Sequence, residues 1–441
     1  MASINLKKGY DLDLRGKILS DTVADAAPSS LYAIVPDDFT GIIPRLDVAE
    51  GDHVDAGMAL FHHKDNEKLK VTSPVSGVIK QVVRGERRKI LSIEIEADKE
   101  HTDFKHDLSQ PAIDVLATSG LLAMMRQRPY DIVPNPAAQP RDIFITCFDS
   151  APLAPDLGLV LGENRQYLEK GVEVLSGLTS GKVYLGCRAE NVIEVAGAET
   201  NVFKGPHPAG NAGVQVANVK PVNKGEVVWT LDVITLARIG KLFAKGVVDF
   251  STTVAVTGSQ VKEPRYLRAT MGCPISSLIS GNLADNGTEN RIISGNVLTG
   301  VAVAADSYLR APYRHVTVIP EIDKKDEFMG WASLSPRKFS VYRLFTSWLT
   351  GNRNVTLDSR LKGGERAIVM AGEYDRMLPM DIYAEFLIKA IITFDIDKME
   401  QLGIYEVAPE DFALAEFADT SKLELQRIVR EGLDKMRKEM E

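Results

Sequence analysis

Two stretches decide the fold of the N-terminal part: Val48-Ala-Glu-Gly-Asp-His-Val-Asp-Ala-Gly-Met-Ala-Leu-Phe61, and Val71-Thr-Ser-Pro-Val-Ser-Gly-Val-Ile79. The glycines at positions 51, 57 and 77 allow tight turns, and apolar residues alternate with polar ones between these turns. Short runs rich in β-branched residues also occur at 31–35, 77–83 and 90–95, separated by Gly, Pro and Asp. We therefore predict that residues 1–100 form an all-β unit.

The two quoted stretches resemble the paired halves of the lipoyl/biotinyl carrier domain, which is a barrel-sandwich hybrid. A carrier presents a modifiable lysine at the tip of the hairpin between them, and counting back from Pro74 puts that position near Asn66. Lys64 and Lys68 lie nearby, but neither has the sequence setting of a carrier lysine. We expect an unmodified structural domain, and a carrier modified on Lys64 or Lys68 is the alternative.

After a polar stretch at 99–114 the pattern changes to that of an α/β protein. Residues 142–147 and 182–187 are typical buried strands, and residues 164–175 between them have the spacing of an amphipathic helix. A strand–helix–strand succession with short turns favours a doubly wound, mostly parallel sheet. We predict a Rossmann-like α/β domain over residues 101–250.

Two further units follow along the chain. Strands at 252–257, 266–270, 297–303 and 314–319, with a short helix opening near residue 272, predict a compact α+β domain over residues 251–330. Residues 331–441 read as a helical C-terminal domain whose tail, 421–441, is amphipathic and highly charged.

Composition limits the possible functions. The 441 residues carry 52 Lys and Arg against 60 Asp and Glu, so the net charge is −8, which argues against general binding to nucleic acid or anionic lipid. No apolar run approaches the ~20 residues of a membrane helix, and the first residues lack the apolar core of a signal peptide. Three separated cysteines, Cys147, Cys187 and Cys273, encode neither a disulfide framework nor a metal site. We expect a cytoplasmic chain.

No motif announces an active site. Residues 177–182, Gly-Leu-Thr-Ser-Gly-Lys, have the wrong spacing for a P-loop and precede a strand, so we interpret them as a turn. No G-x-G-x-x-G follows a predicted strand, which weakens direct nicotinamide binding. His62 and His63 are adjacent on a strand and point to opposite faces, so they are poor joint ligands of one metal.

Two stretches carry side chains of chemical interest. In Gly205-Pro-His-Pro-Ala-Gly210 two prolines fix the backbone around His207, which could donate to a carbonyl or carry a proton. We favour the plainer interpretation of this stretch as a structural loop at a domain junction. Arg126-Gln-Arg-Pro-Tyr130 places two guanidinium groups beside an aromatic ring. It could grip an anion or a polar headgroup, and interdomain hydrogen bonds are the plainer interpretation.

The order of the predicted domains along the chain resembles that of a known protein family. Val256-Thr-Gly-Ser-Gln-Val-Lys-Glu-Pro264 and Met271-Gly-Cys-Pro-Ile275 indicate a soluble-ligand-binding β-grasp unit. The whole chain resembles the A subunits of the bacterial sodium-translocating NADH:quinone oxidoreductases. It is similar, more distantly, to the C subunits of Rnf ferredoxin:NAD oxidoreductases and the flavin-binding subunits of respiratory complex I. Further runs that carry the resemblance are 72–77, 291–300, Phe328–Trp331 and 338–341.

Departures from these relatives bear on cofactors. The flavin-binding relatives use a G-x-G-G-x-G-F-P type of loop, and nothing in this sequence matches it. The Rnf relatives carry two cysteine-rich iron–sulfur motifs near the C-terminus, whereas residues 407–433 keep a ferredoxin-like helical pattern without any cysteine. The resemblance therefore implies a chain without a redox centre, a metal site or catalytic residues of its own. Flavins and iron–sulfur centres would belong to partner subunits.

The family also implies a role and a location. Its complex oxidises NADH, reduces ubiquinone or another quinone, and exports sodium ions. We expect a peripheral subunit on the cytoplasmic face of the bacterial inner membrane, held by the membrane-embedded B subunit in a complex that also contains the C, D, E and F subunits. Candidates for contact with the quinone are Phe39, Arg126, Arg128, Tyr130 and His207.

Three other functions remain as alternatives. The chain could be a pure assembly subunit that never contacts quinone. It could be the stand-alone carrier described above. A soluble NADH dehydrogenase is disfavoured by the missing dinucleotide fingerprint.

Overall fold

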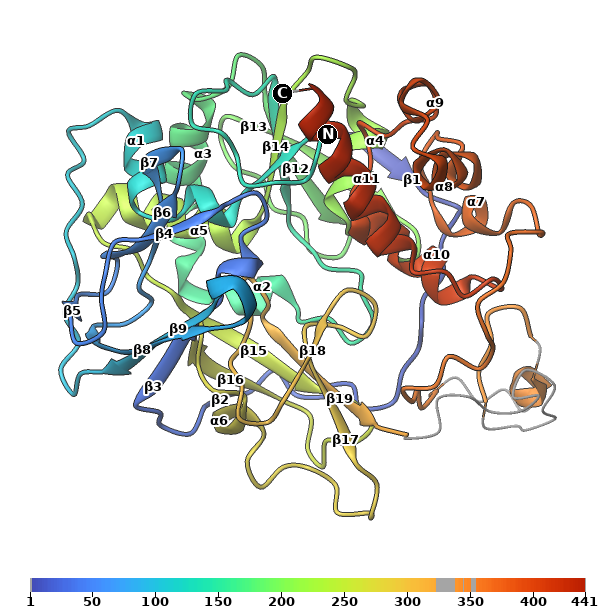
Figure 1. Cartoon of the computed structure of the whole chain (residues 1–441), viewed down its shortest axis with the longest axis horizontal. Coiled ribbons are helices and arrows are strands. Elements are labelled where there is room, and N and C mark those ends of the chain that lie inside the picture. The colour runs from blue at the N-terminus through green and yellow to red at the C-terminus, as the bar shows by residue number, and fades with distance from the viewer. Residues whose placement is uncertain (1, 323–337, 344, 350–353, 441) are drawn as a thin grey trace.

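The computed structural model describes residues 2–322, 338–343, 345–349 and 354–440 (Figure 1). The strands in these ranges form four sheets, two of six strands, one of four and one of three. Within the same ranges no helix combines the length and the apolar character needed to cross a bilayer.

The first unit, which we call the barrel domain (residues 31–97), pairs a four-stranded sheet of order β3-β9-β8-β5 with a three-stranded sheet of order β4-β6-β7. Phe61, Ile93 and Ile95 are fully buried between the strands. Gly77 is required because a Cβ there would lie 2.2 Å from the Glu96 carbonyl oxygen. The strands are β3 (Leu31–Ile34), β4 (Pro44–Leu46), β5 (His53–Val54), β6 (Ala59–His63), β7 (Asn66–Thr72), β8 (Gly77–Arg84) and β9 (Ile90–Ala97).

The tip of the hairpin between β6 and β7 lies two residues before the position expected from the sequence, Asn66. Strand β6 ends at His63, β7 begins at Asn66, and these two residues pair. Lys64 and Asp65 therefore form the turn, and Lys64, not Asn66, occupies the tip. Counting from Pro74 missed this because the ladder between β6 and β7 contains irregular register shifts.

The α/β domain (residues 112–245) is built on a sheet of order β1-β13-β12-β11-β14-β10. All neighbouring strands are parallel except β10 and β14. Ile143 and Ile145 pack into the core that includes α3 and α5, whereas Phe144 packs with Val216 of α4 on the other face. The strands are β1 (Ala2–Asn5), β10 (Arg126–Arg128), β11 (Asp142–Thr146), β12 (Val183–Arg188), β13 (Ala198–Lys204) and β14 (Val228–Asp232).

Helices cover both faces of this sheet, as the alternation along β11 requires. They are α1 (Ala112–Thr118), α2 (Leu157–Leu161), α3 (Leu168–Ser176), α4 (Ala212–Val219) and α5 (Val233–Lys245). From β11 the chain adds β12 and β13 on one side, and then returns to place β14 on the other side of β11. The order of the strands therefore reverses between β11 and β14, where ligands of such folds bind at the carboxyl ends of the strands.

The β-grasp domain (residues 251–320) has a sheet of order β18-β17-β19-β15-β16-β2 and one short helix. Its core includes Val254, Val256 and Leu278, all fully buried. The elements are β2 (Val23–Asp25), β15 (Ser251–Thr257), β16 (Arg265–Thr270), α6 (Ile275–Ile279), β17 (Asn290–Ser294), β18 (Val301–Val303) and β19 (His315–Pro320).

The two strands within the first 25 residues join sheets other than those of the barrel domain. Strand β1 extends the α/β sheet by parallel pairing with β13, and β2 extends the β-grasp sheet by pairing with β16. Edge pairing of such short strands uses backbone groups only, so no side-chain pattern could indicate the partner. The predicted domain boundaries remain predictions.

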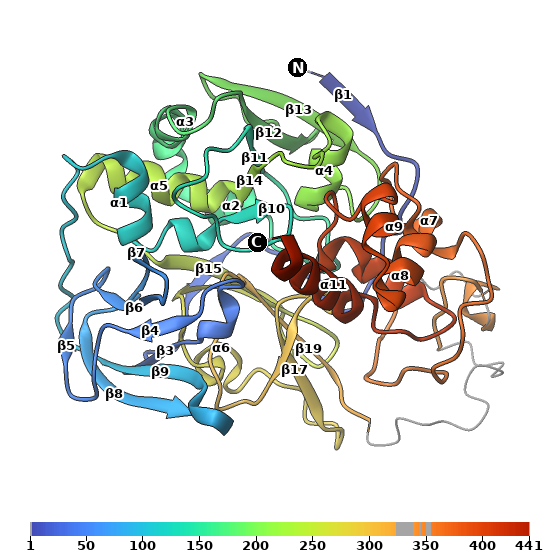
Figure 2. The same cartoon turned by 45° about the horizontal axis from the view of Figure 1, so that its top comes forward.

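The C-terminal helices (residues 373–440) complete the fold, and α11 runs between the α/β and β-grasp domains (Figure 2). The predicted amphipathic tail is α11, whose residues Leu425, Val429 and Leu433 are fully buried. The motif Phe328–Trp331 lies outside the described residues. The helices are α7 (Glu373–Met377), α8 (Ala384–Thr393), α9 (Ile396–Gln401), α10 (Ala413–Ala418) and α11 (Leu425–Met440). Short 3-10 turns are η1 (Pro36–Asp38), η2 (Glu86–Arg88), η3 (Leu122–Met124), η4 (Gly162–Tyr167), η6 (Thr346–Leu349) and η7 (Pro409–Phe412).

Candidate functional site

A cavity of about 510 Å³, which we call the junction cavity, lies where the parts of the chain meet. Its walls come from the carboxyl ends of β11 and β14, from η1 of the barrel domain, from two loops of the β-grasp domain, and from η7 and α11. The cavity thus occupies the point where the strand order of the parallel sheet reverses. This is the position at which open α/β sheets bind ligands.

Ion pairs between domains fix the walls of the cavity. Arg310 of the β-grasp domain donates from Nε to Asp38 Oδ1 of the barrel domain at 2.7 Å. The Ala311 amide donates to the other oxygen of Asp38 at 2.8 Å. Arg314 contacts Asp232, the last residue of β14, at 2.6 Å. Because each pair joins two domains, the shape of the cavity depends on how the domains are assembled.

Asp232 also occupies the N-terminus of α5. Its carboxylate accepts a hydrogen bond from the Thr235 amide at 2.7 Å. Burial opposes ionisation of this carboxyl, but Arg314 and the Thr235 amide outweigh burial and lower its pKa. Asp232 therefore keeps its negative charge at the end of β14, where Arg314 balances it. The turn that holds the pyrophosphate in a Rossmann fold is the one after the first parallel strand of the domain, here β11, and that turn lacks G-x-G-x-x-G.

His207 is the most buried of the predicted site residues that line the cavity, with 3% of its surface exposed. Its amide donates to Asp11 at 2.8 Å, and Nδ1 lies 3.0 Å from the Ser150 hydroxyl oxygen. That oxygen accepts a hydrogen bond from the Gly210 amide at 2.8 Å. Nε2 is buried and has no hydrogen-bond partner among the described residues. Burial lowers the pKa of His207 to about 4, so the imidazole is neutral at pH 7.

Arg126 also lines the cavity and is half-buried. Its guanidinium donates to the carbonyl oxygens of Ala123, Met125 and Asp38 at 3.0–3.3 Å. These bonds hold the head of Arg126 against η1 and leave part of its donor capacity for a ligand.

The other three predicted contacts do not line the cavity. Phe39 is 3% exposed and packs edge-on against Phe61 in the barrel core, with ring centroids 6.1 Å apart. Arg128 is 1% exposed and bonds Asp411 and the Glu406 carbonyl, each at 3.0 Å. Tyr130 has a left-handed backbone with φ of 78° and packs against the C-terminal helices. The structure thus brings two of the five predicted residues together.

Several lining residues were not singled out from the sequence. Phe148 and Asp149 belong to the loop after β11, and Tyr313 donates its hydroxyl proton to the Thr299 carbonyl at 2.8 Å. Burial raises the pKa of Tyr313 to about 12. Of these residues, only those in the loop after β11 could have been found from the sequence. A loop that follows a buried strand at a reversal of strand order is a common position for ligand contacts.

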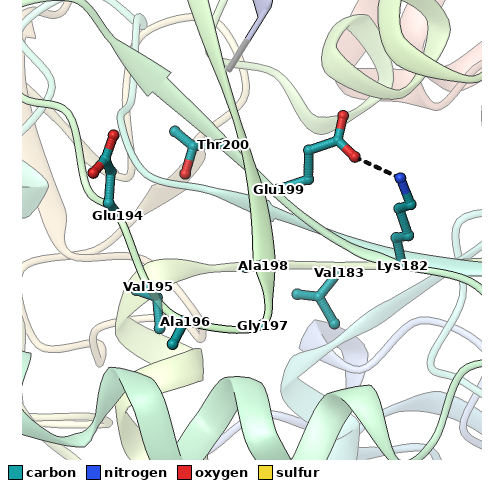
Figure 3. Close-up of a pocket in the computed structure, with 9 residues that line it drawn as sticks. All are labelled: Lys182, Val183, Glu194, Val195, Ala196, Gly197, Ala198, Glu199 and Thr200. Carbon is teal, nitrogen blue, oxygen red and sulfur yellow. Dashed lines mark hydrogen bonds and ion pairs between the residues drawn. The ribbon is translucent and has the colours of Figure 1, made fainter.

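A larger hollow of about 680 Å³ lies elsewhere, beside the turn at residues 194–197 and the start of β13 (Figure 3). Lys182 and Glu199, both exposed, pair with each other there at 2.9 Å. Thr200 donates to the Ile193 carbonyl. Because Lys182 and Glu199 pair with each other in water and the buried Thr200 hydroxyl is already bonded, this hollow is a weaker candidate than the junction cavity.

The fold and the site define a class of multidomain α/β proteins in which a barrel-sandwich hybrid, an α/β domain and a β-grasp domain converge on one cavity. Three family models match this arrangement. They are the NqrA N-terminal barrel-sandwich hybrid domain over residues 4–98, the NqrA second alpha/beta domain over residues 109–248, and the NQRA C-terminal domain over residues 253–305.

Full-length relatives agree with these matches. The chain is 34% identical to the A subunit of the Na(+)-translocating NADH-quinone reductase of Neisseria meningitidis serogroup C, and 35% identical to that of Yersinia pestis bv. Antiqua, over 99% of this chain and 100% of each relative. It is 34% identical to the corresponding protein of Rhodopirellula baltica, over 98% of both chains. The chain belongs to the family of A subunits of the Na+-translocating NADH:quinone reductases, which confirms the resemblance stated from the sequence.

Solved structures add little. An NAD+-reducing nickel–iron hydrogenase chain matches with a TM-score of 0.31 and 11% identity, over 42% of this chain and 41% of that chain. This likeness is too low to support an inference. In the part of the chain that the structure describes, no group of three His, Cys, Asp or Glu side chains could hold a metal ion.

Proposed function

We propose that the junction cavity receives the headgroup of the quinone and that the chain docks on the membrane-embedded B subunit, with the C, D, E and F subunits in the same complex. In this proposal the chain is a peripheral subunit on the cytoplasmic face of the inner membrane. It contributes no redox centre, and flavins and iron–sulfur centres lie on its partners. The relatives are named as subunits of a quinone reductase, which makes a quinone the first ligand to consider.

The observation that carries the quinone proposal is that His207 lines the cavity and that its buried Nε2 has no hydrogen-bond partner among the described residues. A volume of about 510 Å³ lies within the ~300–1,000 Å³ typical of small-molecule sites. A quinone headgroup is planar, largely apolar, and carries two carbonyl acceptors. It therefore needs an aromatic or aliphatic wall and one or two donors.

The lining residues meet these needs. If the Ser150 hydroxyl donates to Nδ1, the proton of the neutral imidazole is on Nε2, where it can donate to a quinone oxygen. Arg126 supplies a cationic donor that favours the reduced, partly anionic oxygen. The ring of Phe148, with the Arg188 guanidinium 5.0 Å from its centroid, can stack on the headgroup. Phe148 thereby replaces Phe39 as the aromatic candidate for contact with the quinone.

A surface on α8 supports docking. The helix buries Leu387 and Ile388 against the other C-terminal helices, yet Phe386 and Ile392 of the helix are 59% and 55% exposed. Tyr383, the residue before the helix, is 66% exposed. A surface helix with large apolar side chains on both sides is typical of a protein–protein contact. A pure assembly role without quinone contact remains the alternative function. The interdomain ion pairs favour it, since they would rigidify a scaffold equally well.

Quinone kinetics of the assembled complex distinguish these functions. An asparagine side chain in place of His207 keeps a polar atom near Nδ1 but none near Nε2, whereas a glutamine side chain reaches the position of Nε2. We expect His207→Asn to raise the quinone KM roughly tenfold, as expected for one lost hydrogen bond, and His207→Gln to raise it less. NADH oxidation with an artificial acceptor serves as the control for assembly. Equal, unchanged quinone KM values in both variants would leave only the assembly role.

A further inference from the structure

Asp149 borders two cavities. It follows β11 by three residues and lines the junction cavity. It also lines a second hollow of about 390 Å³, which we call the outer hollow. Asp149 and Ala151 are the two residues common to both linings. Of these two residues only Asp149 can carry a proton.

The outer hollow is in contact with solvent. Its wall includes the exposed side chains of Asp11, Asp13 and Lys17, and Arg188 at the end of β12. Such a polar wall can hold water beside Asp149. The junction cavity, which Asp149 also lines, has Phe148 and His207 among its other lining residues. Ser150, the residue after Asp149, is hydrogen-bonded to His207 at 3.0 Å.

Asp149 differs from other carboxylates of the junction cavity in its partners. Asp38 is paired with Arg310, and Asp232 with Arg314, at 2.6–2.7 Å. Within the described residues, the Asp149 carboxylate accepts a hydrogen bond from the Ala151 amide at 2.8 Å and forms no ion pair. It can therefore gain or lose a proton without breaking a salt bridge.

The surroundings of Asp149 favour its protonated form. Although the side chain is accessible from the cavities, the protein around it removes bulk hydration, and this raises the pKa of its carboxyl. Asp232 adds to the rise, whereas Arg314 and the Ala151 amide oppose it. Glu410 also faces this group, and the two carboxyls disfavour each other's ionisation. The pKa of the Asp149 carboxyl is therefore raised above its usual value, although the residue is exposed to the two cavities.

We propose that Asp149 transfers protons from water in the outer hollow to the quinone oxygen in the junction cavity. This inference rests on the proposed function. NADH gives up two electrons and one proton on becoming NAD+, and the quinone takes up two electrons and two protons on becoming quinol. In the step assigned here the O–H bond of Asp149 breaks and an O–H bond forms on the reduced quinone. Water in the outer hollow then returns a proton to the carboxylate, and the second proton of the quinol also comes from water.

Replacement of Asp149 by Asn in the assembled complex tests this role. Asn keeps an acceptor for the Ala151 amide, so the loop retains its bond, but an amide cannot deliver a proton. We expect Asp149→Asn to lower the kcat of quinone reduction roughly 100-fold, to leave the quinone KM within twofold, and to alter the pH profile of kcat. Asp149→Glu should restore most of the rate. Glu163→Gln, an exposed carboxyl-to-amide change in η4, is the matched control and should match the wild type.

The outcomes separate the two proposals. If His207→Asn raises the quinone KM while Asp149→Asn leaves both kcat and its pH profile unchanged, the proton transfer is wrong and the quinone site stands. If neither His207→Asn nor His207→Gln changes the quinone KM, the proposed quinone site itself is wrong. A loss of kcat in Asp149→Asn that Glu does not restore, with normal assembly, would also overturn the transfer role.

Discussion

Arg128 Nη1 donates to Asp411 Oδ2 at 3.0 Å, and the two side chains are 1% and 0% exposed. The same carboxylate oxygen accepts from the Ala408 amide at 2.9 Å. It also lies against the start of α4, where a Cβ on Gly213 would be 2.2 Å from it. A buried charge pair therefore fastens the C-terminal helices to the α/β domain. Arg128 is committed to this contact, so we do not retain it as a quinone ligand.

Removing one partner of this pair should be costly. We expect Arg128→Ala to lower the free energy of unfolding of the chain by about 3–5 kcal/mol, because Asp411 would be left buried and unpaired. Chemical denaturation followed by tryptophan fluorescence measures the loss. The double variant Arg128→Met/Asp411→Leu removes both charges and should be more stable than Arg128→Ala alone. A loss below about 1 kcal/mol in Arg128→Ala would show that the pair is not desolvated.

Burial of His207 should make stability depend on pH. Its pKa is about 4 in the folded chain, because burial disfavours the cation, against about 6.5 in an unfolded chain. The unfolded chain therefore binds more protons between these values. The contribution of the neutral His207 to the free energy of unfolding is fully present above pH 6.5 and is lost as the pH falls toward 4. The total loss is roughly 3 kcal/mol at most. Urea denaturation at pH 7.5 and pH 5 should show a smaller difference for His207→Gln than for the wild type. Identical differences would contradict the burial of a neutral imidazole.

Several elements of the fold follow from local patterns. The strands at 142–146 and 183–188 and the helix at 425–440 lie close to their predicted positions, because periodicity and turn residues specify each one locally. The site is different. Asp38 and Arg310 are 272 positions apart, and nothing in either local sequence indicates the other. Phe39 was predicted to face a ligand, but η1 directs its ring into the barrel core, since local sequence does not fix the direction of a loop side chain.

The hairpin tip gives a test of the carrier alternative. Lys64 lies in the turn between β6 and β7, its side chain is 51% exposed, and it is 3.8 Å from the Asp65 carboxylate. A carrier also presents its lysine on such a turn, so position alone does not exclude modification. We expect the intact mass of the purified chain to equal that of the sequence, and Lys64→Arg to change it only by the residue difference. An added biotin or lipoyl mass that Lys64→Arg removes would contradict this expectation.

The turn after β11, the first parallel strand of the α/β domain, lacks the G-x-G-x-x-G pattern of dinucleotide sites, which predicts that the isolated chain does not bind NADH. Trp229 lies on β14, whose carboxyl end lines the junction cavity, so its fluorescence reports on a dinucleotide bound there. We expect no quenching of tryptophan fluorescence on addition of NADH, and an absorption spectrum of the isolated chain without flavin bands. Saturable quenching or a yellow protein would favour the NADH dehydrogenase alternative.

The central claim concerns the occupant of the junction cavity. A structure of the assembled complex with a quinone-site inhibitor bound tests it most directly. The account predicts inhibitor density between the Phe148 ring and His207, with a polar atom within hydrogen-bond distance of His207 Nε2. Density confined to the membrane-embedded subunits, with only water in the junction cavity, would contradict it.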